Sequence, residues 1–151
     1  MTDCTNVKLT LAKKSLEKAT SLIDDLDGNE SEEWVIDGTD IEMLSFNYDD
    51  VNYSQLGFEK VLQKNKIPYD KVWGDGDEYE AGEEFLRVDS NGETYICEIK
   101  TSTFGLIDFE KVKEAFKQSL DAMKSLISDY ETENYVMPWR EQVQLITNSG
   151  Q

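Results

Sequence analysis

The carboxylates with the clearest capacity for chemistry lie in the glycine-rich segment Gly74–Glu84, which holds six acidic residues and one tyrosine. Asp75 and Asp77 have the spacing of the first two ligands of a calcium-binding loop. The pattern then fails, because Tyr79 stands where an oxygen ligand is needed and Glu80 stands where glycine is needed. We therefore expect no metal site. The segment is either a loop that binds a partner through its carboxylates or a solvated connection between strands.

A second pattern is Glu98 and Lys100, which alternate with apolar residues in Tyr95–Lys100. This pattern resembles the catalytic strand of the PD-(D/E)-x-K nuclease superfamily, where carboxylates hold magnesium and the lysine assists the attacking water. The resemblance implies a metal-dependent nuclease that uses Glu98 and Lys100. Such a site also needs an acidic residue close by on the preceding strand. The expected register leaves Asp89 about four residues away and turns Glu84 to the opposite face, so we expect no enzyme.

The chain contains no histidine. This excludes a histidine-based catalytic triad, a histidine general base and a zinc site with histidine ligands. Catalysis by carboxylates, Cys97 or tyrosine remains open, but no spacing indicates it. We expect no catalytic residues and no cofactor.

Charge is segregated along the chain. Residues 19–59 and 72–86 contain no lysine or arginine, yet they carry eighteen of the 32 acidic residues. Such a field attracts basic surfaces and repels nucleic acid and anionic membranes. Aromatic side chains beside the acids can anchor an interface. The predicted partner-binding residues are Asp37, Asp40, Tyr48, Asp49, Asp50, Asp75, Asp77, Glu78, Tyr79, Glu80, Glu83 and Glu84.

The elements that position these residues follow from periodicity and turn signals. Apolar residues at helical spacing predict an amphipathic helix over 9–26, a short helix capped by Ser54 and a long helix from Asp108 to about Tyr130. Phe109 and Phe116 are among the aromatic residues that we expect to be large buried anchors. The predicted strands are 34–36, 41–46 and 69–73, and residues 136–146 form either a short strand or a helix.

The clearest local signal is Asn91-Gly92, which favours a two-residue hairpin loop between 84–90 and 93–101. This loop would place Leu86 opposite Cys97 and Val88 opposite Tyr95. The residues expected to share the core face are Leu86, Val88, Tyr95, Cys97 and Ile99.

A length of 151 residues fits one domain, 1–151, with short flexible tails at 1–6 and 147–151. The order of elements predicts an α+β fold: a mainly antiparallel sheet with the Asn-Gly hairpin, packed against two longer amphipathic helices and one short helix. Cys4 and Cys97 are expected to be reduced thiols. Because the N-terminus has no apolar leader and no run could span a bilayer, we expect a cytoplasmic protein.

The net charge of −17 and the lack of histidine are similar to the composition of small proteins from phages, plasmids and toxin loci that block nucleic-acid enzymes. These include anti-restriction and anti-CRISPR DNA mimics and the immunity proteins of nuclease toxins. Duplex DNA presents about one charge per 1.7 Å of its axis, and carboxylates on a folded scaffold can occupy the same basic groove. We therefore expect a non-enzymatic inhibitor of a basic partner. The alternatives are the nuclease and an acidic structural domain without a specific basic partner.

Overall fold

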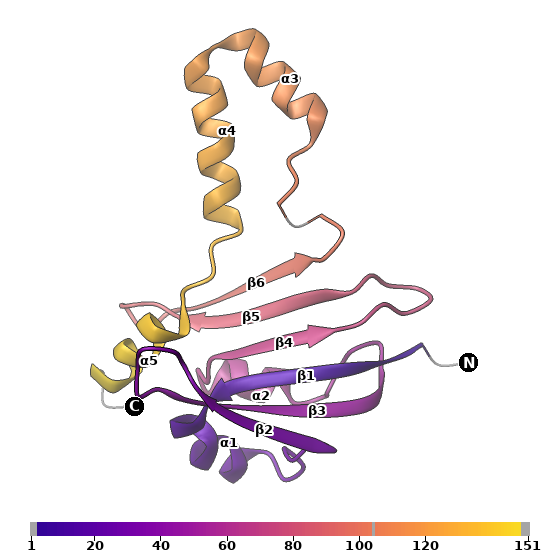
Figure 1. Cartoon of the computed structure of the whole chain (residues 1–151), viewed down its shortest axis with the longest axis vertical. Helices are drawn as coiled ribbons and strands as arrows, with labels where there is room; N and C mark the ends of the chain where they lie inside the picture. The colour runs from indigo at the N-terminus through magenta and orange to yellow at the C-terminus, as the bar shows by residue number, and fades with distance from the viewer. Residues whose placement is uncertain (1–2, 104, 149–151) are drawn as a thin grey trace.

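The computed structural model describes residues 3–103 and 105–148. Its six strands form one antiparallel sheet in the order β2-β3-β1-β4-β5-β6, which confirms the predicted α+β class (Figure 1). The elements in chain order are β1 (Cys4–Ala12), η1 (Lys13–Ser15), α1 (Leu16–Leu22), β2 (Glu30–Val35), β3 (Glu42–Asn52), α2 (Glu59–Lys64), β4 (Tyr69–Trp73), β5 (Gly82–Val88), β6 (Thr94–Lys100), α3 (Phe109–Gln118), α4 (Leu120–Glu133) and α5 (Trp139–Asn148).

The first element differs from the prediction. The helix expected over 9–26 begins only at Leu16, and the residues before η1 form β1, a central strand paired with β3 and β4. The positions of Leu9 and Leu11 fit both the apolar stripe of a helix and the alternation of a strand. Hydrogen bonding to β3 on one edge and β4 on the other stabilises the strand. β1 also includes Cys4–Asn6, which the sequence assigned to the N-terminal tail.

The main core lies on one face of the sheet, under α1 and α2. Strand residues such as Leu9, Phe46 and Leu86 meet Ala19 of α1 and Leu62 of α2 there. These side chains are almost completely removed from water, and each burial stabilises the fold by roughly 1.5–3 kcal/mol for a Leu or Phe. The short helix begins at Glu59, later than the cap predicted at Ser54.

The last helix, α5, is anchored to the other face of the sheet. The buried guanidinium of Arg87 forms a 2.7 Å ion pair with Asp70, donates to the carbonyl of Met137 and stacks 4.4 Å from the ring centroid of Trp139. Burial raises the pKa of the Asp70 carboxyl, and Arg87 and the indole N–H of Trp139 partly offset this rise. The weak pattern of 136–146 is thus resolved as a helix.

The β5–β6 hairpin has a different register from the predicted one. Asp89 and Glu93 close a three-residue loop, in which only Gly92 has positive φ, at 77°. The Asp89 carboxylate accepts hydrogen bonds from the amides of Asn91 and Glu93, which favours this longer turn. Phe85 therefore faces Cys97, and Glu84 faces Glu98.

This shift of one residue changes the face assignment of the hairpin. Cys97 and Ile99 are buried and Glu98 is exposed, as expected. Leu86 and Val88, however, lie on the α1–α2 face, while Tyr95, Cys97 and Ile99 lie on the other. The shared core face predicted for all five residues is therefore wrong, because both faces of this sheet are partly covered.

Two helices, α3 and α4, occupy the segment where the sequence predicts one long helix from Asp108. Asp108 caps α3 through the amides of Glu110 and Lys111, but Ser119 adopts extended backbone and caps α4. The resulting α3–α4 hairpin stands away from the sheet (Figure 1). Phe109 and Phe116, expected in the core, are 71% and 78% exposed.

The remaining expectations concern the termini and the thiols. Thr147 and Asn148, assigned to the C-terminal tail, end α5, whereas 1–2 and 149–151 lie outside the described residues. Among the described residues, neither Cys4 nor Cys97 forms a disulfide bond. Within 3–103 and 105–148, no helix has the length and apolar character to cross a membrane.

Candidate functional site

The acidic loop 74–81 joins β4 to β5 and is held in a defined shape. The carboxylate of Asp3, itself 9% exposed, accepts hydrogen bonds from the amides of Asp77 (2.8 Å) and Glu78 (2.7 Å). Asp75 accepts from the amide of Ala81, and the indole N–H of Trp73 donates to the carbonyl of Glu80. Because these contacts order the backbone before binding, the carboxylates of Asp77 and Glu78 project from a pre-organised loop.

Gly76 is required for this loop. A Cβ at this position would lie 2.5 Å from Oδ1 of Asp3 and 2.5 Å from the ring of Tyr79. The missing side chain lets the Asp3 carboxylate approach the loop backbone. The glycine at position 76 therefore permits close packing of the loop backbone against Asp3, just before β1.

A hollow of about 480 Å³ lies beside this loop, on the same face of the sheet as the α1–α2 core. Its floor includes Glu84 and Glu98, which are directly paired across β5 and β6, and Lys100 on the same face. Glu84 was expected on the opposite face from Glu98, and the register shift overturns that expectation. Side chains opposed in this way have Cβ atoms about 4.5–5.5 Å apart, and two like charges there are destabilising unless a cation neutralises them.

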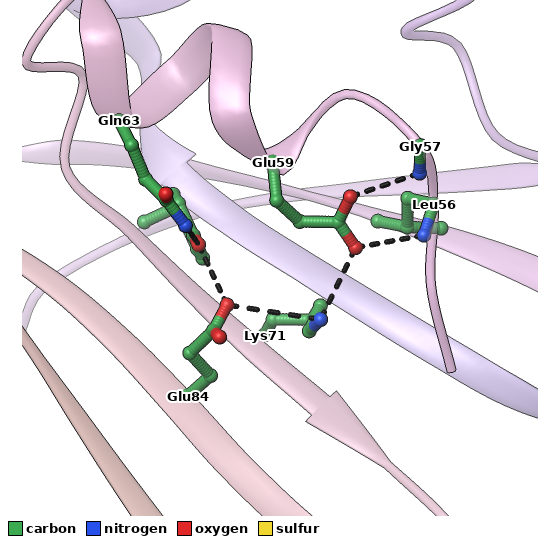
Figure 2. Close-up of polar contacts among 7 residues, drawn as sticks. Leu56, Gly57, Glu59, Gln63, Lys71 and Glu84 are labelled. Atoms are coloured by element: carbon green, nitrogen blue, oxygen red, sulfur yellow. Dashed lines mark hydrogen bonds and ion pairs between the residues drawn. The ribbon is translucent and has the colours of Figure 1, made fainter. Parts of the chain in front are cut away.

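Lys71 is a buried cation that lines this hollow, and Figure 2 shows its ammonium between the carboxylates of Glu59 and Glu84. Its side chain is 7% exposed and lies between Glu59 (3.1 Å) and Glu84 (3.7 Å). Glu84 also accepts a 2.6 Å hydrogen bond from the hydroxyl of Tyr69, which in turn accepts from Gln63. Lys71 is thus fully engaged by the fold and leaves Glu98 without a buried counter-charge.

The pKa values in this network follow from burial and from donors. Burial raises the pKa of the Glu59 carboxyl, but the backbone amides of Leu56 and of Glu59 itself and the ammonium of Lys71 outweigh that effect, so the pKa is lowered. Burial, and then the hydrogen bond to Glu84, raise the pKa of the Tyr69 hydroxyl. The ionised Glu59 and the neutral Tyr69 are therefore parts of the structure at neutral pH.

A second hollow, of about 630 Å³, continues the site between α1, the end of β3 and the segment before α2. Asp24, Asp25, Asp49 and Asp50 line it, and the ring of Tyr48 forms part of its wall. Both hollows include Gln55, so they meet at this residue. We call the combined surface the acidic groove; its charged side chains are Asp24, Asp25, Asp49, Asp50, Glu78, Glu80, Glu84, Glu98, Lys71 and Lys100.

Ion pairs within the protein neutralise few of the carboxylates in the groove. Within the described part of the chain, Glu84 is the one groove carboxylate that forms an ion pair. By contrast, Glu32, Glu33 and Glu42 of the first acidic run pair with Lys8 or Lys13. The unpaired negative charge of the two base-free runs is therefore concentrated at one end of the sheet.

The structure brings together only some of the predicted partner-binding residues. Tyr48, Asp49, Asp50, Glu78, Tyr79, Glu80 and Glu84 line the groove, and Asp75 and Asp77 lie on the adjoining loop. Asp37 and Asp40 lie in the β2–β3 turn at the other end of the sheet, close to α5. Glu83 faces the opposite side, in a hollow that includes Trp139.

Sequence reasoning missed Asp24, Asp25 and Glu98 as members of the same surface. Asp24 and Asp25 follow the first helix, and nothing in the sequence indicates that this point lies beside the end of β3. The lack of lysine and arginine in residues 19–59 was the available signal. It applies equally to Asp24 and Asp25 and to the carboxylates of β2 that form ion pairs, so it could not distinguish the two groups.

Comparisons with known proteins give no further assignment. No protein-family model matches the chain, and no curated protein or solved structure is significantly similar to it. Within 3–103 and 105–148, no group of three or more Asp, Glu or Cys side chains is arranged to hold a metal ion. The geometry of the groove is therefore the basis for the functional argument.

Proposed function

We propose that this chain is a non-enzymatic binding protein whose acidic groove occludes a basic, nucleic-acid-binding surface of a partner protein. The observation that carries the proposal is the joining of two acid-lined hollows at Gln55, with eight carboxylates and only two lysines on one surface. A nucleic-acid enzyme presents lysine and arginine side chains in a groove that fits a dense ladder of phosphates. A continuous row of carboxylates on a rigid sheet is complementary to such a surface.

The side chains between the carboxylates favour a protein partner over a small inorganic cation. Tyr53, Trp73 and Tyr79 line the same hollow as Glu78 and Glu98. Flat aromatic faces next to carboxylates suit guanidinium groups, which stack on rings while they donate to carboxylates. An arginine placed between Glu84 and Glu98 would also remove the repulsion between these two opposed side chains.

The proposal includes the cytoplasm as the place of action. The partner would be a nucleic-acid enzyme, as for DNA-mimicking inhibitors of restriction, CRISPR or toxin nucleases. Cys4 and Cys97 form no disulfide bond within the described residues, which is compatible with a reducing compartment. Direct binding to nucleic acid is disfavoured, because the net charge of −17 repels phosphate.

The experiment is a capture followed by competition. Immobilised wild-type protein is used to capture partners from a host lysate at low ionic strength, in parallel with the variant Asp25→Lys, Glu78→Lys. These two exposed residues lie one in each hollow. The control, Asp37→Lys with Asp40→Lys, makes the same charge change at the opposite end of the sheet. Binding of the captured protein to duplex DNA is then measured with equimolar wild-type chain.

We expect the control to retain the partner, the groove variant to lose it, and the wild-type chain to displace DNA from it. Binding should weaken as the Debye length falls from about 30 Å at 0.01 M salt to about 8 Å at physiological ionic strength. Equal capture by both variants, or DNA binding that the chain does not affect, would refute the proposal.

One observation favours a second candidate, the metal-dependent nuclease. Glu84 and Glu98 face each other and Lys100 lies on the same face, so the acidic neighbour that the sequence failed to provide is present. The hydrogen bond from Tyr69 and the ion pair with Lys71 nevertheless occupy Glu84. Incubation of purified protein with DNA and RNA and either magnesium or manganese tests this candidate. Cleavage that disappears in both Glu98→Ala and Lys100→Ala would establish the nuclease and reject the binding protein.

A further inference from the structure

The α3–α4 hairpin carries large apolar side chains that the rest of the chain does not cover. Phe109, Phe116 and Leu120 are 71%, 78% and 70% exposed, and Ile127 is 45% exposed. The two helices pack on each other and project from the sheet (Figure 1). Helices of this length are marginal without tertiary packing of an apolar face, so the hairpin lacks the contacts that usually stabilise such helices.

The exposed apolar residues have a regular spacing. Phe109 and Phe116 are seven residues apart on α3, and Leu120 and Ile127 are seven residues apart on α4. This spacing places each pair on one stripe of its helix, as in helices that pack side by side in bundles. The surface therefore fits another pair of helices better than it fits an extended peptide or a flat sheet.

The distribution of charge along the hairpin supports a second copy of this chain as the partner. Most of the surface of a chain with net charge −17 repels another copy. Residues 109–124, however, contain four lysines and three carboxylates, so the approach of two copies is not opposed there. The C-terminal part of α4 is acidic, with Asp129, Glu131 and Glu133. The tip of the hairpin is therefore close to neutral, with Lys117 and Lys124 beside Glu114 and Asp121, and Lys117 pairs with Glu114 on its own helix. The base of the hairpin carries the excess of carboxylates, so these two lysines are the cations that another copy could bring to Glu131 and Glu133.

We propose that two copies associate through their α3–α4 hairpins, placed side by side and antiparallel, to form a four-helix bundle. A two-fold axis then brings Lys117 and Lys124 of each copy near Glu131 and Glu133 of the other. The apolar stripes become buried between the four helices. This inference is independent of the acidic groove, which lies at the end of the sheet with the 74–81 loop.

The available area is consistent with a dimer interface. At 71% and 78% exposure, the two phenylalanines alone present roughly 300 Å² per copy, taking about 200 Å² for a full aromatic side chain. Leu106, Leu120, Ile127 and the helix surfaces around them add to this area. A standard interface takes about 800 Å² from each partner.

The first test is the mass of the protein in solution, measured by sedimentation equilibrium up to about 1 mM, the weak end of protein–protein affinity. We expect the wild type to reach twice the 17.3 kDa chain mass. Phe116→Glu should weaken association by roughly 10-fold to 100-fold, because it removes the burial of an aromatic side chain. Gln118→Glu makes the same charge change on the opposite side of α3 and should leave association within about threefold of wild type. Circular dichroism checks that both variants remain folded.

The second test exchanges charges and distinguishes self-association from binding to another partner. One variant carries Lys117→Glu with Lys124→Glu, and the other carries Glu131→Lys with Glu133→Lys. Each alone should dimerise more weakly than wild type, because like charges meet at both ends of the interface. Their equimolar mixture should restore a dimer with one copy of each. A monomeric wild type, a Phe116→Glu variant that dimerises normally, or a mixture that does not pair would each overturn the proposal.

Discussion

At the scale of single residues, the sheet contains two buried ionic clusters with different roles. Arg87 links β4, β5 and α5 through Asp70, Met137 and Trp139 and thereby holds the last helix in place. Lys71 lies between Glu59 and Glu84 under the acidic groove. Removing one partner from a buried ion pair is strongly destabilising, because the other charge remains in a poor environment. The folded state therefore depends on both clusters.

Glu59→Gln tests the Lys71 cluster. We expect a loss of about 2 kcal/mol of unfolding free energy at neutral pH, less than for a fully orphaned charge because Glu84 still faces Lys71. The folded pKa of Glu59 is lowered. The ionised Glu59 carboxylate therefore adds to the unfolding free energy above the pKa of the unfolded chain, about 4.3. This stabilisation is lost as the pH falls through the lower pKa of the folded protein.

Urea unfolding of wild type and variant between pH 7 and pH 3 measures this effect. The difference between their unfolding free energies should shrink as the solution becomes acidic. Glu17→Gln on the exposed side of α1 is the matched control and should stay within about 0.5 kcal/mol of wild type. A difference that stays constant down to pH 3 would exclude a lowered pKa for Glu59.

At the scale of elements, the N-terminal strand has two functions. β1 lies in the middle of the sheet, and Asp3 just before it fixes the 74–81 loop through the amides of Asp77 and Glu78. Tyr53, which follows β3, donates its amide to the carbonyl of Asp3. The start of the chain thus joins the two acidic runs, although it belongs to neither of them.

Asp3→Ala should release the loop without unfolding the sheet. Two backbone amides lose a charged acceptor, which costs about 1–3 kcal/mol. We therefore expect hydrogen exchange at the amides of Asp77 and Glu78 to accelerate by roughly tenfold or more, with little change in β1 and β4. Asp77→Ala is the control, because it removes a loop carboxylate but leaves the Asp3 acceptor in place. If exchange in Asp3→Ala matches this control, Asp3 does not order the loop.

At the scale of the whole molecule, the charge is distributed unevenly. Ion pairs to Lys8 and Lys13 neutralise part of β2 and β3, while the groove keeps its carboxylates almost unpaired. The net charge of −17 favours expansion of the chain through self-repulsion. The fold is therefore expected to be more stable when salt screens this repulsion.

The midpoint of urea unfolding at pH 7 should rise between 0.01 M and 0.15 M sodium chloride. The groove variant Asp25→Lys, Glu78→Lys should show a smaller rise. Its two substitutions make the net charge less negative by four units and so reduce the repulsion at that end of the sheet. A midpoint that falls with salt would mean that attractive ion pairs outweigh repulsion, contrary to the uneven distribution described above.

Several features could be predicted from the sequence because they depend on neighbouring residues. The strands near 34–36, 41–46 and 69–73, the helix start at Asp108 and the burial of Cys97 and Ile99 follow from local periodicity and turn chemistry, and the structure confirms them. The α+β class with an antiparallel sheet follows from the order of such elements. The lack of histidine, the net charge and the two base-free runs are fixed by composition alone.

Only the tertiary structure decided which of these residues meet. The segment with Leu9 and Leu11 is a strand despite its helical spacing, because β3 and β4 pair with the two edges of β1. The Asp89 carboxylate selected a three-residue hairpin loop, and this shift of one residue placed Glu84 opposite Glu98. Asp24 and Asp50 share a groove with Gln55, whereas Asp37 lies at the other end of the sheet. The physical reason is that strand pairing and register are set by contacts between distant segments, which local propensity does not contain.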